Sequence, residues 1–222
     1  MPKQLTKLQS KQQLVIKSSQ SGFTIIESLL AMMVITILMV GLAPIIALSV
    51  ATRVQARRVE LGAEAAKTYI DGVRSGIILD PEINTTALSD VGAPPAGNLT
   101  CDDNAECTAP ANNLYCIDGD GDKICTSNST TDMIVQGSGF SPVAITDADD
   151  GYSLGVRVYR ADAFQEQALE TSSDLDSNKA LTFTGGLGKR KAPLVEITTE
   201  ITTAKTNMND FRRRFPNLPN TN

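Results

Sequence analysis

The most prominent feature of the chain is an uncharged, apolar stretch near its amino terminus. Residues 28–52 carry no charged side chain, and 19 of these 25 residues are apolar. An α-helix rises by about 1.5 Å per residue, so a helix of this length spans the ~30 Å hydrocarbon core of a bilayer. A buried helix of a soluble protein seldom runs this long with every face apolar. The pattern therefore predicts a membrane-spanning helix.

Beyond this stretch the apolar positions become periodic. They recur at spacings of seven and four, which places them on one face of a helix, and most charged side chains lie off that face. Gly76 is suited to a helix C-cap, and Pro81 lies beyond it. We therefore expect one long helix whose second half packs against a globular domain. The residues of this apolar face are Val54, Leu61, Ala65, Tyr69 and Val73.

Two residues that disfavour helix, Gly41 and Pro44, lie inside the apolar stretch. Proline lacks a backbone N–H, and its ring clashes with the preceding turn, so it kinks or breaks a helix. We therefore expect a helix break at Gly41 and Pro44, in the form of a bend or local melting.

The carboxyl half of the chain shows the alternation of β-strands. Residues 152–159 alternate most clearly, residues 194–202 form the second strand, and residues 133–135 and 181–184 are weaker candidates. Residues 161–170 are compatible with a short helix. We expect a three- or four-stranded antiparallel sheet on the second half of the long helix, which is an α+β fold. The expected inner-face residues are Tyr152, Leu154, Val156, Val158, Val195, Ile197 and Ile201.

All four cysteines lie within 25 residues, at Cys101, Cys107, Cys116 and Cys125. Their spacing lacks the paired C-x2-C knuckles of a structural zinc site. Two disulfides are expected, because the domain after a membrane-spanning helix would lie outside the cytoplasm. Three pairings are open. We favour Cys101–Cys107 with Cys116–Cys125, because both close small loops.

An Asp- and Gly-rich loop lies between the last two cysteines. Asp118, Asp120 and Asp122 alternate with glycines and could turn their carboxylates towards one hard cation, as a calcium site requires. The match to an EF-hand loop is partial, because Lys123 replaces the usual glycine and Ser129 the closing glutamate. Calcium is the one cofactor indicated; the alternative is a solvated acidic turn. Nearby acidic residues that would join the site if the fold allows it are Asp147, Asp149 and Asp150.

Composition excludes several functions. The chain has no histidine, which rules out Ser-His-Asp and Cys-His nucleophiles and His-containing zinc or iron sites. Only carboxylate chemistry remains, and no pair of carboxylates stands out, so we expect no enzymatic activity. A net charge of −5 without a basic patch argues against nucleic-acid binding.

The residues that precede the apolar stretch have an unusual order for a secretory signal. Residues 1–22 carry four lysines and no acidic residue, and a Gly22-Phe23 junction comes before the apolar stretch instead of after it. A single acidic residue, Glu27, follows. The stretch Gly22-Phe-Thr-Ile-Ile-Glu-Ser-Leu-Leu30 resembles the processing signal of the type IV prepilin family, which includes the pseudopilins of type II secretion. The general layout of the chain also loosely resembles cyanobacterial pseudopilins linked to hormogonium polysaccharide secretion.

The resemblance implies a processing and assembly pathway. A prepilin peptidase would cut between Gly22 and Phe23 and methylate the new amino terminus at Phe23. The apolar helix would remain as membrane anchor and then contact other pilin or pseudopilin subunits, with an inner-membrane assembly platform as a further partner. Glu27 would pair with the Phe23 amino group of a neighbouring subunit and set the axial register. The alternative is a Glu27 that only reaches the lipid headgroups.

The four lysines of the leader favour a single-pass topology with the amino terminus in the cytoplasm and the carboxyl domain in the periplasm. We expect a minor pilin or pseudopilin that supports export, motility or adhesion. The alternative is a single-span anchored ectodomain that binds calcium or glycan and does not polymerise. The expected parts are residues 1–22 (cleaved leader), 23–52 (transmembrane and polymerisation half of the spine helix), 53–76 (its amphipathic half), 77–132 (disulfide and Asp-rich loop region), 133–208 (antiparallel sheet domain) and 209–222 (flexible tail).

Overall fold

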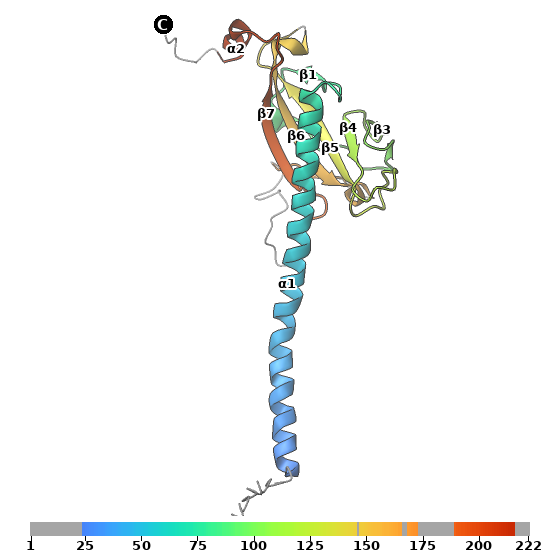
Figure 1. Cartoon of the computed structure of the whole chain (residues 1–222), viewed down its shortest axis with the longest axis vertical. Helices are drawn as coiled ribbons and strands as arrows, with labels where there is room; N and C mark the ends of the chain where they lie inside the picture. Colours follow the sequence, from blue (N-terminus) through green and yellow to red (C-terminus); the bar gives the residue numbers. More distant parts are fainter. Residues whose placement is uncertain (1–23, 146, 166–167, 173–188, 216–222) are drawn as a thin grey trace, which may run out of the picture. The chain divides into compact units, whose positions relative to one another are not determined.

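The computed structural model describes residues 24–145, 147–165, 168–172 and 189–215. The chain divides into two compact units, residues 1–45 and 46–222. A long helix, α1 (Ile25–Arg74), begins in the first unit, and the second unit contains a five-stranded sheet (Figure 1). The other elements are β1 (Ile83–Asn84), β2 (Thr100–Cys101), β3 (Cys107–Ala109), β4 (Leu114–Ile117), β5 (Met133–Phe140), β6 (Tyr152–Arg160), β7 (Val195–Ile201), α2 (Met208–Arg214) and 3-10 turns at Leu88–Asp90, Ala148–Asp150 and Ala161–Phe164.

The carboxyl end of α1 is closed by a glycine, as the sequence predicts. Gly76 has a φ of 72°, a conformation that costs glycine little. Its N–H donates to the Val73 carbonyl at 3.0 Å, and the Ile77 N–H donates to the Gly72 carbonyl at 3.0 Å. This pair of bonds is a Schellman motif, which satisfies carbonyls that the end of a helix leaves free.

Of the two predicted forms of a helix break at Gly41 and Pro44, local melting does not occur in this structure. α1 continues as a regular helix through both residues. A proline inside a helix removes one backbone hydrogen bond, whereas the bonds of the turns on either side remain. In the single chain that loss does not end the helix.

The sheet is built around β5 and β6, which pair antiparallel along the whole of β5. β7 lies on the other edge of β6, while β4 and β1 share the remaining edge of β5. β1 runs parallel to β5, so the sheet is mixed and the expectation of a purely antiparallel sheet is wrong on this point. Parallel pairing is possible because the chain between β1 and β5 is long enough to cross back.

One face of the sheet packs against the second half of α1. The alternating side chains of β6 that we expected to face inward are completely buried there, which confirms the predicted α+β arrangement. Burying such a helix face and sheet face together is what makes a small sheet stable. The main contributors to this core are Ala65, Ala66, Tyr69, Ile70 and Val73 of α1 with Val135, Tyr152, Leu154, Val156, Val158, Leu194 and Ile201.

A second buried cluster contains both disulfides. The structure joins Cys101 to Cys107 and Cys116 to Cys125, which is the pairing expected from the short loops. Three of these cysteines are buried with Ile134 of β5 and with further apolar residues of β4 and β6. The region 77–132, expected as loop, therefore contains β1 to β4, and β4 belongs to the main sheet.

Two further expectations about the carboxyl half need correction. Where a helix was expected over residues 161–170, the described part of that range, residues 161–165 and 168–170, contains a short 3-10 turn, Ala161–Phe164, and no α-helix. Residues 209–214 were expected to begin a flexible tail, yet they form most of α2. The predicted strand at 181–184 lies outside the described residues.

Candidate functional site

The first functional feature is the apolar surface of α1. The large apolar side chains between Ile25 and Val50 each keep 41% or more of their surface exposed. Among the described residues, α1 is the one helix that is long and apolar enough to cross a membrane. A core helix of a soluble protein would be mostly buried, whereas no residue of the most apolar 18-residue window of α1 is buried within the described chain. The exposed apolar helix therefore indicates membrane anchoring.

The start of α1 presents one carboxylate. The Glu27 N–H donates to the Thr24 hydroxyl at 3.3 Å, so Thr24 acts as a helix cap. Glu27 is the only acidic residue of the first helical turn, and its side chain is exposed. Among the described residues, nothing forms a hydrogen bond or ion pair with its carboxylate. The predicted cleavage residues, Gly22 and Phe23, lie outside the described residues.

The second feature is the acidic loop between β4 and β5. Asp118 accepts hydrogen bonds from the N–H groups of Asp120 (3.0 Å), Gly121 (2.7 Å) and Lys123 (2.9 Å). The bonds from Gly121 and Lys123 hold the pKa of the Asp118 carboxyl below its usual range. Lys123 adopts a left-handed conformation with φ of 66°, at the position where an EF-hand loop has glycine.

The structure brings a different third aspartate into this loop. Carboxylate oxygens of Asp118, Asp120 and Asp132 lie within 4.8 Å of one another. Asp122, which we expected as the third ligand, is not part of this group; its carboxylate instead accepts the Ile124 N–H at 2.8 Å. Asp132 immediately precedes β5 and is fully buried, and burial raises the pKa of its carboxyl.

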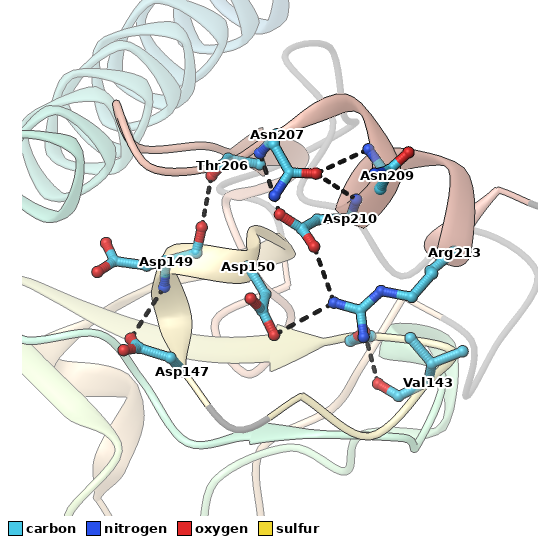
Figure 2. A network of polar contacts seen from close by, with 10 residues as sticks. Val143, Asp147, Asp149, Asp150, Thr206, Asn207, Asn209, Asp210 and Arg213 are labelled. Carbon is cyan, nitrogen blue, oxygen red and sulfur yellow. Dashed lines mark hydrogen bonds and ion pairs between the residues drawn. The ribbon is translucent and has the colours of Figure 1, made fainter.

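The acidic residues Asp147, Asp149 and Asp150 do not join this group. They lie beside α2, where the Asp149 carbonyl accepts the Thr206 hydroxyl at 2.7 Å (Figure 2). The Asp149 carboxylate also forms an ion pair with Lys205. Lys205 lowers the pKa of the Asp149 carboxyl. Asp149 and Asp150 therefore fasten the carboxyl-terminal segment to the domain, while Asp147 caps its own turn by accepting the Asp149 N–H at 3.1 Å.

Helix α2 is held by its own cap and by buried arginine. Asn207 and Asp210 form a reciprocal capping box, in which the Asn207 N–H donates to Asp210 at 3.0 Å (Figure 2). Arg213 contacts both Asp210 (2.9 Å) and Asp150 (3.5 Å). Arg214 is buried and pairs with Glu200 of β7 at 2.7 Å. Arg213 and Arg214, which lie in the part of the chain expected as a flexible tail, therefore hold α2 to the domain.

Comparison with known proteins identifies the amino-terminal segment. A family model described as the prokaryotic N-terminal methylation motif matches residues 17–43. The match covers the Gly22-Phe23 junction, Glu27 and the first part of the exposed apolar helix. No curated protein and no solved structure matches the chain. The match supports a type IV pilin-like prepilin signal, which implies processing by a prepilin peptidase and assembly with other pilin-type subunits.

Asp132 and Arg214 belong to these features, but neither was predicted from the sequence. Asp132 lies ten positions after Asp122, the last aspartate of the Asp-Gly motif, and follows a Ser/Thr-rich segment. Its only local signal is its place directly before residues 133–135, one of the weaker strand candidates. Arg214 lies in a polar, Pro-containing end of the chain, and nothing local distinguishes it from its two arginine neighbours.

Proposed function

We propose that the chain is a prepilin-like minor pilin or pseudopilin. It is processed between Gly22 and Phe23, methylated on Phe23, and assembled into a type IV pilus or a type II secretion-like pseudopilus. The observation that carries this proposal is the coincidence of the methylation motif at residues 17–43 with an apolar helix whose side chains are exposed. That surface suits lipid before assembly and the helices of neighbouring subunits afterwards.

In this proposal Glu27 has a role in assembly. A carboxylate in an apolar environment is costly unless it is paired, and Glu27 lacks a partner among the described residues. The amino group that processing creates on Phe23 lies about one helical turn away along the chain. In a filament, the Glu27 of one subunit would pair with the Phe23 amino group of the next.

The proposed topology places the leader in the cytoplasm and residues 53–222 in the periplasm. It follows from the four lysines of residues 1–22 and from the two disulfides, which persist in an oxidising compartment. Export of a polysaccharide is the narrower role that the general layout favours. Genes for prepilin-like proteins and glycosyltransferases beside this one would support that narrower role.

The test is the amino terminus of the mature chain, measured by mass spectrometry of the membrane fraction. We expect a chain that begins with N-methylated Phe23. A Gly22→Leu variant should remain unprocessed because the bulky side chain blocks the scissile bond, whereas the matched Ser21→Leu variant should be cut normally. A chain that retains Met1, or that is cut at another position, would contradict the proposal.

A second candidate function is favoured by the acidic loop. The domain would then be a single-span anchored ectodomain that binds calcium or glycan and does not polymerise. The same measurement separates the two candidates, because an ectodomain of this kind has no need of cleavage before Phe23. Absence of the chain from purified filaments, together with an intact leader, would favour the second candidate.

A further inference from the structure

The acidic loop combines three carboxylates from two parts of the chain. Asp118 and Asp120 belong to the turn that follows β4, and Asp132 precedes β5, whose pairing with β4 brings the two parts together. Their oxygens lie within 4.8 Å of one another. No arginine or lysine among the described residues forms an ion pair with any of the three. Like charges this close repel one another unless a cation or a proton lies between them.

The buried member of the group has an unused acceptor. Asp132 is 0% exposed; one of its oxygens accepts the Gly119 N–H at 3.2 Å. Its second oxygen, Oδ2, has no hydrogen-bond partner among the described residues. Buried carboxylate oxygens are normally hydrogen-bonded, paired with a cation or bound to a metal. An unpaired, fully buried oxygen on a carboxylate that faces two others is therefore an observation in favour of a bound cation.

We propose that Asp118, Asp120 and Asp132 bind one calcium ion. The donors are all oxygens, and calcium and magnesium prefer oxygen, whereas zinc prefers His and Cys. Calcium accepts six to eight oxygen ligands at about 2.3–2.6 Å in flexible geometry, which suits three carboxylates that come from two parts of the chain. Magnesium demands near-ideal octahedral geometry at about 2.0–2.1 Å and usually keeps several of its waters, so a dedicated group of protein carboxylates suits it less.

The surroundings suit a cation of this kind. The hydroxyls of Thr131 and Ser129 lie 3.0 and 3.4 Å from the Asp120 carboxylate and add neutral oxygens at the edge of the group. The disulfide Cys116–Cys125 closes the loop, so that ordering it around an ion costs less entropy. Because Asp120 is exposed, we expect a calcium affinity like that of extracellular calcium-binding modules, with a Kd of about 10⁻⁴–10⁻³ M.

The proposal concerns residues 118–132 and does not depend on the proposed function in a filament. The test uses the full chain, purified in detergent with its disulfides intact and stripped of metal with EGTA. Isothermal titration with calcium chloride should show one ion bound per chain, and the Tm should rise with calcium concentration. Magnesium chloride at the same concentrations should give little heat. Calcium chloride that shows no saturable binding up to about 10 mM would overturn the proposal.

Variants test the ligand set. Asp118→Asn and Asp120→Asn should each weaken calcium binding about tenfold or more. Asp122→Asn is the matched control: it removes the same charge from the same loop, but it lies outside the group and should leave Kd unchanged. An Asp122→Asn variant that loses calcium as completely as Asp120→Asn would overturn the proposed ligand set. Asp132→Asn should abolish binding, and because Asp132 is buried, far-ultraviolet circular dichroism must show that this variant is folded.

Discussion

The Tyr69 ring of α1 lies directly over Gly137 of β5. A Cβ atom at position 137 would lie 2.8 Å from the Tyr69 Cζ atom and closer still to its hydroxyl. Glycine in a strand usually weakens it, so its presence here marks a close approach between elements. The absent side chain at Gly137 lets α1 lie close against the sheet, and burial raises the pKa of the Tyr69 hydroxyl well above its usual value.

Replacing Gly137 with alanine should destabilise the domain. The added methyl group would overlap the Tyr69 ring, and overpacking of this kind costs about 1–3 kcal/mol in free energy of unfolding. Urea unfolding of the purified chain measures the loss. Gly92→Ala is the matched control, because a Cβ atom there meets nothing within 4 Å. Equal stability of Gly137→Ala and Gly92→Ala would contradict the close packing of α1 on β5.

The capping box of α2 should make the carboxyl end sensitive to acid. The hydrogen bond from the Asn207 N–H lowers the pKa of the Asp210 carboxyl, with Arg213 adding to the effect. A depressed pKa means that Asp210 contributes stability above the pKa of the unfolded chain, about 3.9, and that this contribution is lost as the pH falls through the lower folded value. The carboxyl end should therefore loosen below about pH 4.

The measurement compares urea midpoints at neutral and acidic pH for wild type and Asp210→Asn. The variant should be less stable than wild type at neutral pH, and the two should converge in acid. Asp71→Asn removes an exposed carboxylate of α1 that has no ion pair among the described residues, and it should follow wild type at both pH values. If the urea midpoints of wild type and Asp210→Asn differed by the same amount at all pH values, ionisation of Asp210 would not contribute to stability.

Removing the disulfide Cys116–Cys125 should destabilise the sheet domain. Its partners are nine residues apart, and a loop of this size contributes about 3 kcal/mol in the chain-entropy account. The double Cys116→Ala, Cys125→Ala variant also loses sulfur atoms from a buried cluster. The corresponding Cys101→Ala, Cys107→Ala variant is the comparison, and it should lose less because Cys101 is only half-buried. Urea unfolding without reductant measures both, and a larger loss in the second variant would contradict this prediction.

Replacing Glu27 with valine should separate membrane insertion from assembly. Valine makes the helix more apolar, so insertion should be intact, whereas the proposed pairing with Phe23 of a neighbour is lost. We expect the variant in the membrane fraction at normal levels, and about tenfold less of it in sheared filaments. Ser28→Val, which makes a similar change at the next residue, is the control. Normal incorporation of Glu27→Val would contradict a role of Glu27 in assembly.

Much of the fold could be predicted because its signals are local. The alternation of residues 152–159 identified β6 and its buried face, and Gly76 identified the end of α1. The two-residue strand β1 could not be predicted, because a pair such as Ile83-Asn84 has no periodicity and pairs with β5 only after the chain has crossed back. The continuation of α1 through Pro44 was also not predicted, because the surrounding helix tolerates the loss of one hydrogen bond.

The two functional features differ in the same way, since one rests on local sequence signals and the other on contacts between distant residues. The apolar anchor, Glu27 and the Gly22-Phe23 junction could be recognised from the sequence by itself, because hydrophobic length and a short processing motif are properties of contiguous residues. Only the tertiary structure decided that Asp132 joins Asp118 and Asp120 while Asp122 turns elsewhere, and that Arg214 is buried against Glu200. Those contacts depend on how the strands pair and on which side chains the folded sheet buries. Neither can be read from the local sequence, because the residues involved are distant in the chain and meet only when the sheet has formed.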